Sequence, residues 1–407
     1  MTPVPAWRAL PFPPLSLLLA GLLAAAPAAA AGVREGFQGA LALSPDLRAL
    51  EAEREVVTAR RAQAEALLPG APILGLGYRS DAVTQNRGFR EYEGSLGLPV
   101  WLPGAASALR GSAEAQGLRL TARQARQRLL LAGEVRDAYW AWALAAAERD
   151  AARARLAAAQ ALERDLARQV GAGNAPRADL LLAQADARDA QLTLRDRETA
   201  VREAALAFRS LTGAEPTPQG GEPDRSATAA PGEDPRLRAV RAAATAGRAD
   251  ANLARVRDRP DPELGLQLRQ ERGSFDEPYG TRIQLGVRIP FAHAPAVRER
   301  VALAQADITA AEAEAAQLDR ALALARDRAR VRLEAARDLA RGAETRHAVL
   351  AERAGLVERA YRGGELPLVE LVRARAALAD ADAARRRAMV EAGRAVSQLN
   401  QVSGVEP

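Results

Sequence analysis

The chain repeats itself once, with a period close to half its length. Pro45 recurs as Pro235 after 190 residues, and the turn proline Pro176 recurs as Pro367 after 191 residues. Other matched segments keep the same spacing, namely 96–98 with 285–287, and 211–213 with 402–404. This period is far longer than that of a solenoid repeat. The pattern therefore predicts a duplicated domain half, in which each structural element occurs twice.

The N-terminal segment reads as an export signal. Arg8 lies in a short polar start, an apolar run follows over 15–23, and an alanine run ends at Ala31. These features are typical of a secretory signal peptide, which we place at 1–31. No later segment contains the roughly 18 to 20 apolar residues that a spanning helix needs. We therefore expect an exported protein without a helical membrane span.

Composition argues against several classes of function. The chain has no cysteine, so it can form no disulfide and carries no cysteine for an N-terminal lipid anchor. It has only two histidines, and no metal-ligand spacing, catalytic triad, paired carboxylates or phosphate-binding loop stands out. The net charge is +6 and comes entirely from arginines scattered along alanine-rich segments, which argues against nucleic acid as a partner. We expect no enzyme, no cofactor and no metal site.

Each repeat contains one very long helix and one shorter returning helix. The long helices are predicted over 103–170 and 295–361, each roughly 100 Å long at about 1.5 Å per residue. Glycine and proline then mark tip turns at 171–176 and 362–367, followed by returning helices over 177–212 and 368–402.

The repeats extend over 32–213 and 235–407, with a Pro/Gly-rich connector at 214–234 that we expect to bulge out at mid-height. A helix opens each repeat, and the one over 235–257 would lie end to end with the returning helix 177–212 along one long helix.

Two β-hairpins are predicted between the opening and the long helices, at 72–102 and 262–292. Apolar and polar or small residues alternate there, which is the period-2 pattern of strands with two unlike faces. Strands of about ten residues are long enough to cross a bilayer when tilted. The expected lipid-facing and aromatic-girdle residues are Leu74, Leu76, Tyr78, Tyr92, Leu96, Leu98, Trp101, Leu264, Leu266, Tyr279, Ile283, Leu285, Val287 and Phe291. Aromatic residues also favour strands in general, so the aromatics alone do not decide between a membrane and a soluble sheet.

Four strands cannot close into a membrane barrel, since such barrels begin at about eight strands. An open edge in lipid would leave backbone groups unpaired at several kcal/mol each. If the hairpins lie in a membrane, the chain must be an oligomer, and three copies would supply twelve strands.

The combination of signal peptide, duplication, paired hairpins and long helices resembles the TolC-like outer-membrane efflux proteins. The resemblance extends to Pro176–Leu181 and Pro367–Val372 after the tip turns, and to Tyr139–Trp140 on the first long helix. The segment Tyr361–Glu365 is similar to the heavy-metal-efflux branch of that family. The resemblance covers essentially the whole mature chain.

The resemblance implies a fold class that is mainly α with a membrane β part. In it, a homotrimer shares a 12-strand barrel in the outer membrane, continued by an α-helical barrel through the periplasm. The implied function is the exit duct of a tripartite efflux pump or type I secretion system, passive and non-lipidated. The implied partners are a periplasmic membrane-fusion adaptor, an inner-membrane RND- or ABC-type transporter, and outer-membrane lipid.

The same resemblance assigns the tips to adaptor docking and to the pore entrance. The residues concerned are Gly171, Gly173, Asn174, Pro176, Asp179, Leu180, Gly363, Gly364, Glu365, Pro367, Glu370 and Leu371. Asp179 and Glu370 also lie in the first turns of their helices, where a carboxylate interacts favourably with the helix dipole in any protein. The competing hypothesis is a periplasmic coiled-coil adaptor or scaffold without a pore, which would explain the long helices but not the duplication.

Overall fold

The computed structural model describes residues 30–218, 221–228, 233–291 and 294–407. Among the helices of these residues, none is both long and apolar enough to cross a membrane. The predicted signal peptide lies outside the described residues except for Ala30–Ala31, which form strand β1. β1 pairs in parallel with β4, Glu215–Pro216, and the Ala31 side chain is buried in the core. A signal boundary after Ala31 would remove this short strand.

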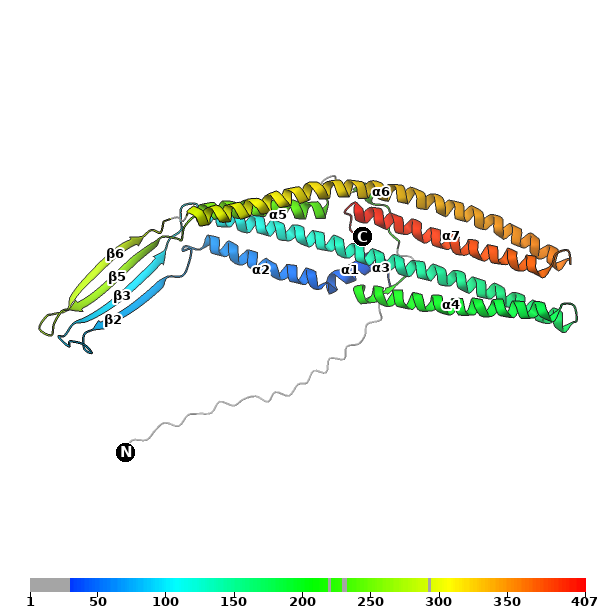
Figure 1. Ribbon diagram of the computed structural model, residues 1–407, viewed down its shortest axis with the longest axis horizontal. Helices are drawn as coiled ribbons and strands as arrows, with labels where there is room; N and C mark the ends of the chain where they lie inside the picture. The colour runs from blue at the N-terminus through cyan, green and yellow to red at the C-terminus, as the bar shows by residue number, and fades with distance from the viewer. Residues whose placement is uncertain (1–29, 219–220, 229–232, 292–293) are drawn as a thin grey trace, which may run out of the picture.

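The described chain is an elongated bundle of helices with one sheet at its end (Figure 1). The first repeat contains α1 (Val33–Leu43), α2 (Pro45–Glu65), β2 (Ile73–Ser80), β3 (Arg90–Pro99), α3 (Ala105–Gly171) and α4 (Arg177–Thr212). The second contains α5 (Pro235–Val256), β5 (Glu263–Arg272), β6 (Gly280–Arg288), α6 (Ala294–Arg362) and α7 (Leu368–Val402). A short 3₁₀ turn, η1 (Ser226–Thr228), lies between them. The prediction of a mainly α chain with long antiparallel helices and a four-strand sheet is confirmed.

The first repeat opens with two helices, where the sequence suggested one. Pro45 cannot donate a backbone hydrogen bond, and the Ser44 hydroxyl accepts one from the Leu47 amide, so α1 ends and α2 begins at this point. The break has no counterpart in α5, and the two repeats therefore differ at their starts.

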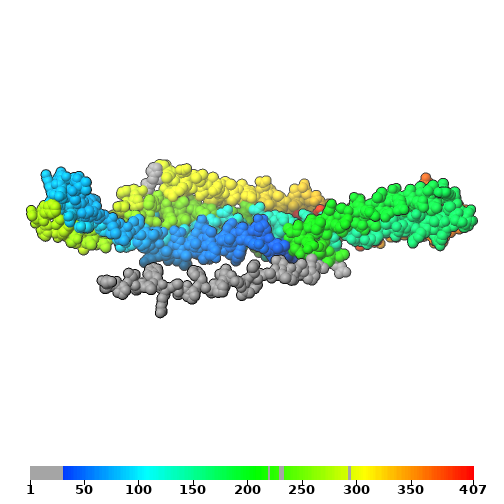
Figure 2. Space-filling model, turned by 90° about the horizontal axis from the view of Figure 1, so that it is seen from below, coloured from blue at the N-terminus to red at the C-terminus, as the bar shows by residue number. Residues whose placement is uncertain are grey.

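The long helix α3 organises the bundle. α2 and α5 pack along its sheet-proximal half, and α4 and α7 pack along its tip half. α4 and α5 thus both lie along α3, but they do not meet end to end. α4 instead abuts α1, where the Gly36 backbone approaches the Phe208 ring, and the two helices follow one another on the face seen in Figure 2. α5 abuts α7, since the Arg236 guanidinium donates to the Val402 carbonyl oxygen at 3.0 Å. Each returning helix therefore stacks on the opening helix of its own repeat.

The main core lies at this junction, halfway along the bundle. Its largest buried side chains are aromatic, with Phe37 from α1, Tyr139 and Trp142 from α3, and Phe208 from α4. The Tyr139 hydroxyl donates to the Thr217 carbonyl oxygen at 3.0 Å, which anchors the start of the connector. Elsewhere alanines fill the helix interfaces, as Ala159, Ala187 and Ala190 do between α3 and α4. Small side chains of this kind allow long helices to approach closely without bulky knobs.

The described part of the connector is held against α3 and α7 by a buried ion pair. Arg136 on α3 donates through Nε and Nη2 to both Glu222 oxygens, each at 2.8 Å, and the side chains are only 3% and 6% exposed. Ser397 on α7 donates to the same carboxylate at 2.5 Å, and Arg136 also donates to Gln401 and to the Val405 carbonyl. The connector is therefore tucked into the bundle here, where the sequence had suggested a bulge.

We expect Glu222→Ala to destabilise the protein by about 3–5 kcal/mol, because it leaves the buried Arg136 without its carboxylate. The exposed pair Arg123–Glu53 is the matched control, and Glu53→Ala should cost less than about 1 kcal/mol. Denaturant unfolding of both variants in detergent, followed by helical circular dichroism, measures the difference. Equal losses of unfolding free energy in the two variants would show that the Arg136–Glu222 pair does not hold the connector in place.

The junction of α5 and α7 also contains a buried carboxylate. Asp234 caps α5 by accepting from the Arg236 amide at 2.9 Å, and Arg326 of α6 lies 3.4 Å from its Oδ2. Burial by itself would raise the pKa of Asp234, but the hydrogen bonds and charge of Arg236, with the charge of Arg326, outweigh it. The pKa is therefore held below its ordinary value.

A lowered pKa stabilises the folded chain above the unfolded value of 3.8, and this contribution is lost as pH falls through the lower folded value. Asp234→Asn keeps a capping oxygen but cannot ionise. We expect the variant to melt below the wild type at neutral pH, with the gap closing as pH falls below about 4. A gap that stays constant from neutral to acidic pH in thermal melts would contradict this assignment.

Candidate functional site

The sheet order β2-β3-β5-β6 places the two hairpins side by side. Because directly paired residues share a face in an antiparallel sheet, the register fixes which side chains lie together. Leu74 pairs with Leu96, Leu96 with Leu266, and Leu266 with Leu285, so one apolar row crosses all four strands. The register likewise places the other expected lipid-facing strand residues on this face, namely Leu76, Tyr78, Tyr92, Leu98, Leu264, Ile283 and Val287.

This apolar face is open to its surroundings in the single chain. Leu76 is 83% exposed and Leu285 is 75% exposed. A continuous exposed patch of this kind normally marks a surface that contacts a partner or lipid.

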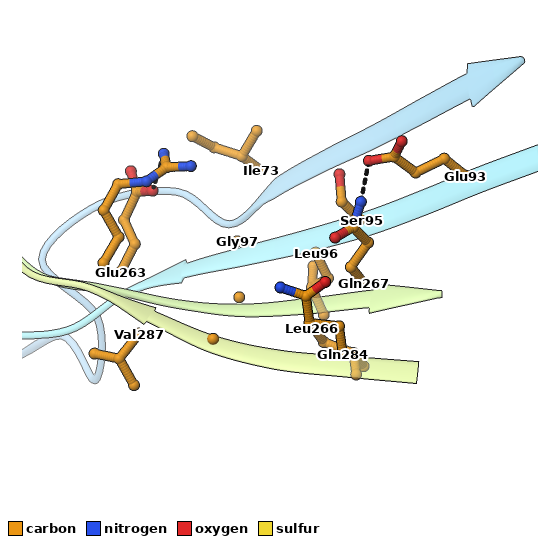
Figure 3. A pocket seen from close by; sticks show the side chains of 13 residues that line it. Ile73, Glu93, Ser95, Leu96, Gly97, Glu263, Leu266, Gln267, Gln284 and Val287 are labelled. Carbon is orange, nitrogen blue, oxygen red and sulfur yellow. Dashed lines mark hydrogen bonds and ion pairs between the residues drawn. The ribbon is translucent and has the colours of Figure 1, made fainter. Parts of the chain in front are cut away.

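The opposite face is polar and forms a shallow groove (Figure 3). Ser95, Gln267 and Gln284 lie in one row across β3, β5 and β6, and Gln267 donates to the Glu93 carboxylate, shown as a dashed line. Glycines make up most of a neighbouring row, with Gly97, Gly265 and Gly286 leaving the groove without side chains there. The arrangement suits the inner wall of a water-filled conduit.

The charges on the polar face are paired across the strands. Arg79 of β2 and Arg269 of β5 lie 3.5 and 3.6 Å from Glu91 Oε1, and both also lie 3.8 Å from Glu93. Further along, Arg282 meets Glu271 at 2.8 Å, and Arg288 meets Glu263 at 3.1 Å. Four arginines and four glutamates therefore balance one another, so this face carries no excess of either sign.

Aromatic side chains lie at both ends of the apolar face. Near the hairpin turns, Tyr92 has its ring centroid 5.1 Å from Tyr78 and 6.2 Å from Tyr279. At the helical end, the Trp101 indole donates to the Ala66 carbonyl oxygen at 2.9 Å. Phe291, just beyond β6, is 89% exposed.

The two tip turns have the same backbone structure, residue for residue. The Gly173 and Gly364 amides donate to the Val170 and Tyr361 carbonyls at 3.0 Å, and both glycines have a positive φ, 76° and 75°. The next amide in each turn, from Asn174 or Glu365, donates to a carbonyl of the last helical turn. Glycine is required at the left-handed position because a side chain is strained there. The duplication thus includes the details of the tips, with Gly171 as the last residue of α3.

The tips of the two helix pairs pack against one another. Leu162 and Leu166 of α3 form one buried cluster with Leu368 and Leu371 of α7, and Leu180 is partly buried against it. Leu371 is only 2% exposed, so its side chain joins the helix pair α3–α4 to the helix pair α6–α7. It is not on an outer docking surface, contrary to the sequence-based assignment. An apolar residue on the inner face of a tip is needed to hold the hairpins together.

Tyr361 is a tip residue that the site assignment from sequence did not single out. Its hydroxyl lies 3.5 Å from the Gln169 amide oxygen of the other hairpin. Burial, with the nearby charges of Asp179 and Asp165, raises the pKa of Tyr361, so its hydroxyl stays protonated and can donate across the interface. In the sequence, the feature that could have drawn attention to this residue is its place in the last turn of the predicted long helix 295–361.

Asp179 and Glu370 lie in the first turns of α4 and α7, and both are partly buried. Glu370 meets Arg373 at 2.8 Å on its own helix. Gly363, Pro176 and Pro367 complete the exposed surface of the tips. In the part of the chain that the structure describes, no group of three or more His, Cys, Asp or Glu residues could hold a metal ion.

Comparison with known proteins relates the first repeat to a protein family. Residues 37–214 match the family model described as outer membrane efflux protein. Among the curated proteins, no match was found.

Several solved structures share the fold over almost the whole chain. The outer membrane protein VceC from Vibrio cholerae is 16% identical, with a TM-score of 0.70 over 92% of this chain and 96% of its own. The CmeC outer membrane channel of Campylobacter jejuni is 14% identical, with a TM-score of 0.71 over 91% and 85%. CusC is 16% identical, with a TM-score of 0.70 over 93% and 92%, so no branch of the family stands out.

The family match covers the first repeat, and the shared fold extends the likeness across the second. Residues 37–214 thus match the outer membrane efflux protein family, and the chain as a whole has the fold of solved outer membrane channels.

Proposed function

We propose that the protein is the exit duct of a tripartite export system and that it works as a homotrimer. The observation that carries the proposal is the two-faced sheet, whose outer strands β2 and β6 each leave one edge without a partner in the described chain. Pairing β6 of one copy with β2 of the next would join three sheets into a closed barrel of twelve strands. The apolar faces would then contact lipid and the polar grooves would line the pore.

The barrel would be the protein's only anchor, since the chain contains no cysteine that could carry a lipid. Passage through the duct would be passive, because the polar face offers paired charges and amides rather than a binding site. Energy would come from an inner-membrane transporter of the RND or ABC type, through a periplasmic adaptor. Similarity of the segment 361–365 to the heavy-metal-efflux branch supports metal efflux as one candidate task.

The first test is the native mass of the detergent-extracted protein from an outer-membrane fraction. We expect a trimer of three mature chains, because a single chain leaves its two sheet edges unpaired. A soluble monomer or dimer would instead support a periplasmic scaffold without a pore.

We propose further that the tips form the pore entrance and dock the adaptor. Their exposed surface comprises Gly173, Asn174, Gly364 and Glu365, with Asp179 and Glu370 beside it, and its backbone geometry is the same in both repeats. A partner that meets one tip could therefore meet the other in the same way, giving six similar contacts around a trimer.

Adjacent residues on β6 provide a matched test of the lipid-facing side. Leu285→Arg would place a charge on the apolar face, and we expect it to impair insertion by about 2–4 kcal/mol if it lies near mid-membrane. Leu98→Arg, on β3, should behave in the same way. Gln284→Arg is the control, because its side chain lies on the polar face. Insertion is measured as the folded fraction in lipid vesicles, and equal effects of all three variants would refute the assignment of faces.

A second pair of variants tests the tips as the working end. An added Cβ at Gly173 or Gly364 meets no other atom within 4 Å, so substitution strains only the turn itself. We expect Gly173→Asp and Gly364→Asp to abolish export while leaving trimer assembly and insertion intact. Export by whole cells is measured together with the amount of inserted trimer, which separates a loss of export from a loss of assembly or insertion. Wild-type export by both variants would exclude the tips from docking.

A further inference from the structure

The arginines of the sheet divide sharply by face. On the polar face all four, Arg79, Arg269, Arg282 and Arg288, lie within 4 Å of a glutamate. Two more arginines lie on the apolar face, Arg90 on β3 and Arg272 on β5, and the register pairs them directly. Neither has a carboxylate within 4 Å in the described part of the chain. They form a basic pair on the face that carries the leucines and tyrosines, beside the uncharged polar residues Ser80, Gln270 and Thr281.

The surroundings of this pair hold Arg272 in place without neutralising it. Its Nε donates to the Gly88 carbonyl oxygen at 3.2 Å. Its guanidinium lies 5.0 Å from the Tyr279 ring centroid and 5.4 Å from that of Phe275. Such cation–π contacts fix the plane of the group but leave its charge intact. Arg90 is half-buried beside it, and among the described residues its side chain has no hydrogen-bond partner.

The position of the pair along the strands is specific. Arg90 lies two residues before Tyr92 on the same face of β3, about 7 Å nearer to the hairpin turn. The ten residues of β3 span roughly 34 Å, or about 25 Å when tilted, which is the height of the apolar band of a membrane barrel. The hairpin turns lie at the end of the sheet away from the helices (Figure 1). If the helices are periplasmic, the basic pair lies at the outer leaflet, directly above the tyrosines.

We propose that Arg90 and Arg272 bind the phosphate group of an anionic glycolipid of the outer leaflet, of the lipid A type. The inference rests on the proposed function, since it requires the apolar face to contact lipid. Two neighbouring guanidinium groups suit a phosphate, whose oxygens accept paired hydrogen bonds from each. The leucines and tyrosines below them would contact the acyl chains of the same molecule. This apolar platform favours a lipid over a free anion, and a trimer would carry three such sites.

The test uses the full-length trimer in detergent and native mass spectrometry, with diphosphoryl lipid A as the probe. We expect the double variant Arg90→Gln/Arg272→Gln to bind the probe about ten-fold more weakly than the wild type, because two charge-assisted contacts are lost. Arg282→Gln is the matched control on the polar face and should bind as the wild type does. Lipid A without its phosphates should bind the wild type as weakly as the double variant binds the intact probe.

Two further measurements keep the outcome decisive. Arg272→Gln also removes the contacts with Phe275 and Tyr279. Arg90→Gln breaks no side-chain hydrogen bond or ion pair among the described residues, so it must weaken binding on its own. Inorganic phosphate in excess should leave the lipid bound, and its displacement of the lipid would show a free-anion site instead. Trimeric, inserted variants that bind lipid A as the wild type does would overturn this inference and leave the proposed function standing. A wild type that forms no trimer would overturn both.

Discussion

The requirement that every backbone group in a membrane be hydrogen-bonded governs this molecule. The four strands satisfy it between themselves but leave one edge of β2 and one of β6 without a partner in the described chain. A sheet in that state can enter lipid only with further strands on its two edges, which is the argument for the proposed trimer. The alternation of leucine with glycine, glutamine or charge then gives such a barrel an apolar outside and a polar inside.

The helices are subject to a different constraint, since they pack side by side over many turns without a large hydrophobic core. Alanine at the α3–α4 interface allows close approach over long distances, and the aromatic residues of the helices, except Tyr361 at the tip, lie at the junction at mid-length. That junction is also where the repeats join and where buried charges occur, at Arg136–Glu222 and Asp234–Arg326. The polar groups there hold helix ends and the connector in register, which aliphatic packing alone would fix less specifically.

The two ends of the molecule differ in how they meet their surroundings. The tips present a small polar surface built on left-handed glycines, with the packing residues Leu368 and Leu371 turned inward. The outer end of the sheet presents tyrosines and an unpaired arginine couple, a combination suited to an interface between hydrocarbon and phosphate. Among the described residues, the arginines of the polar face are paired with glutamates, whereas Arg90 and Arg272 on the apolar face are not.

Sequence alone determined the elements, because their signals are local. Alternation marked the hairpins, long glycine-poor segments marked the helices, and Gly-Pro punctuation placed α4 and α7 at the residues where the structure has them. The same local patterns assigned the strand residues to faces. Only the tertiary structure showed that Leu371 is buried, that the connector is held by Arg136, and that Arg90 lies beside Arg272. These depend on contacts between residues far apart in the chain, which no periodicity encodes.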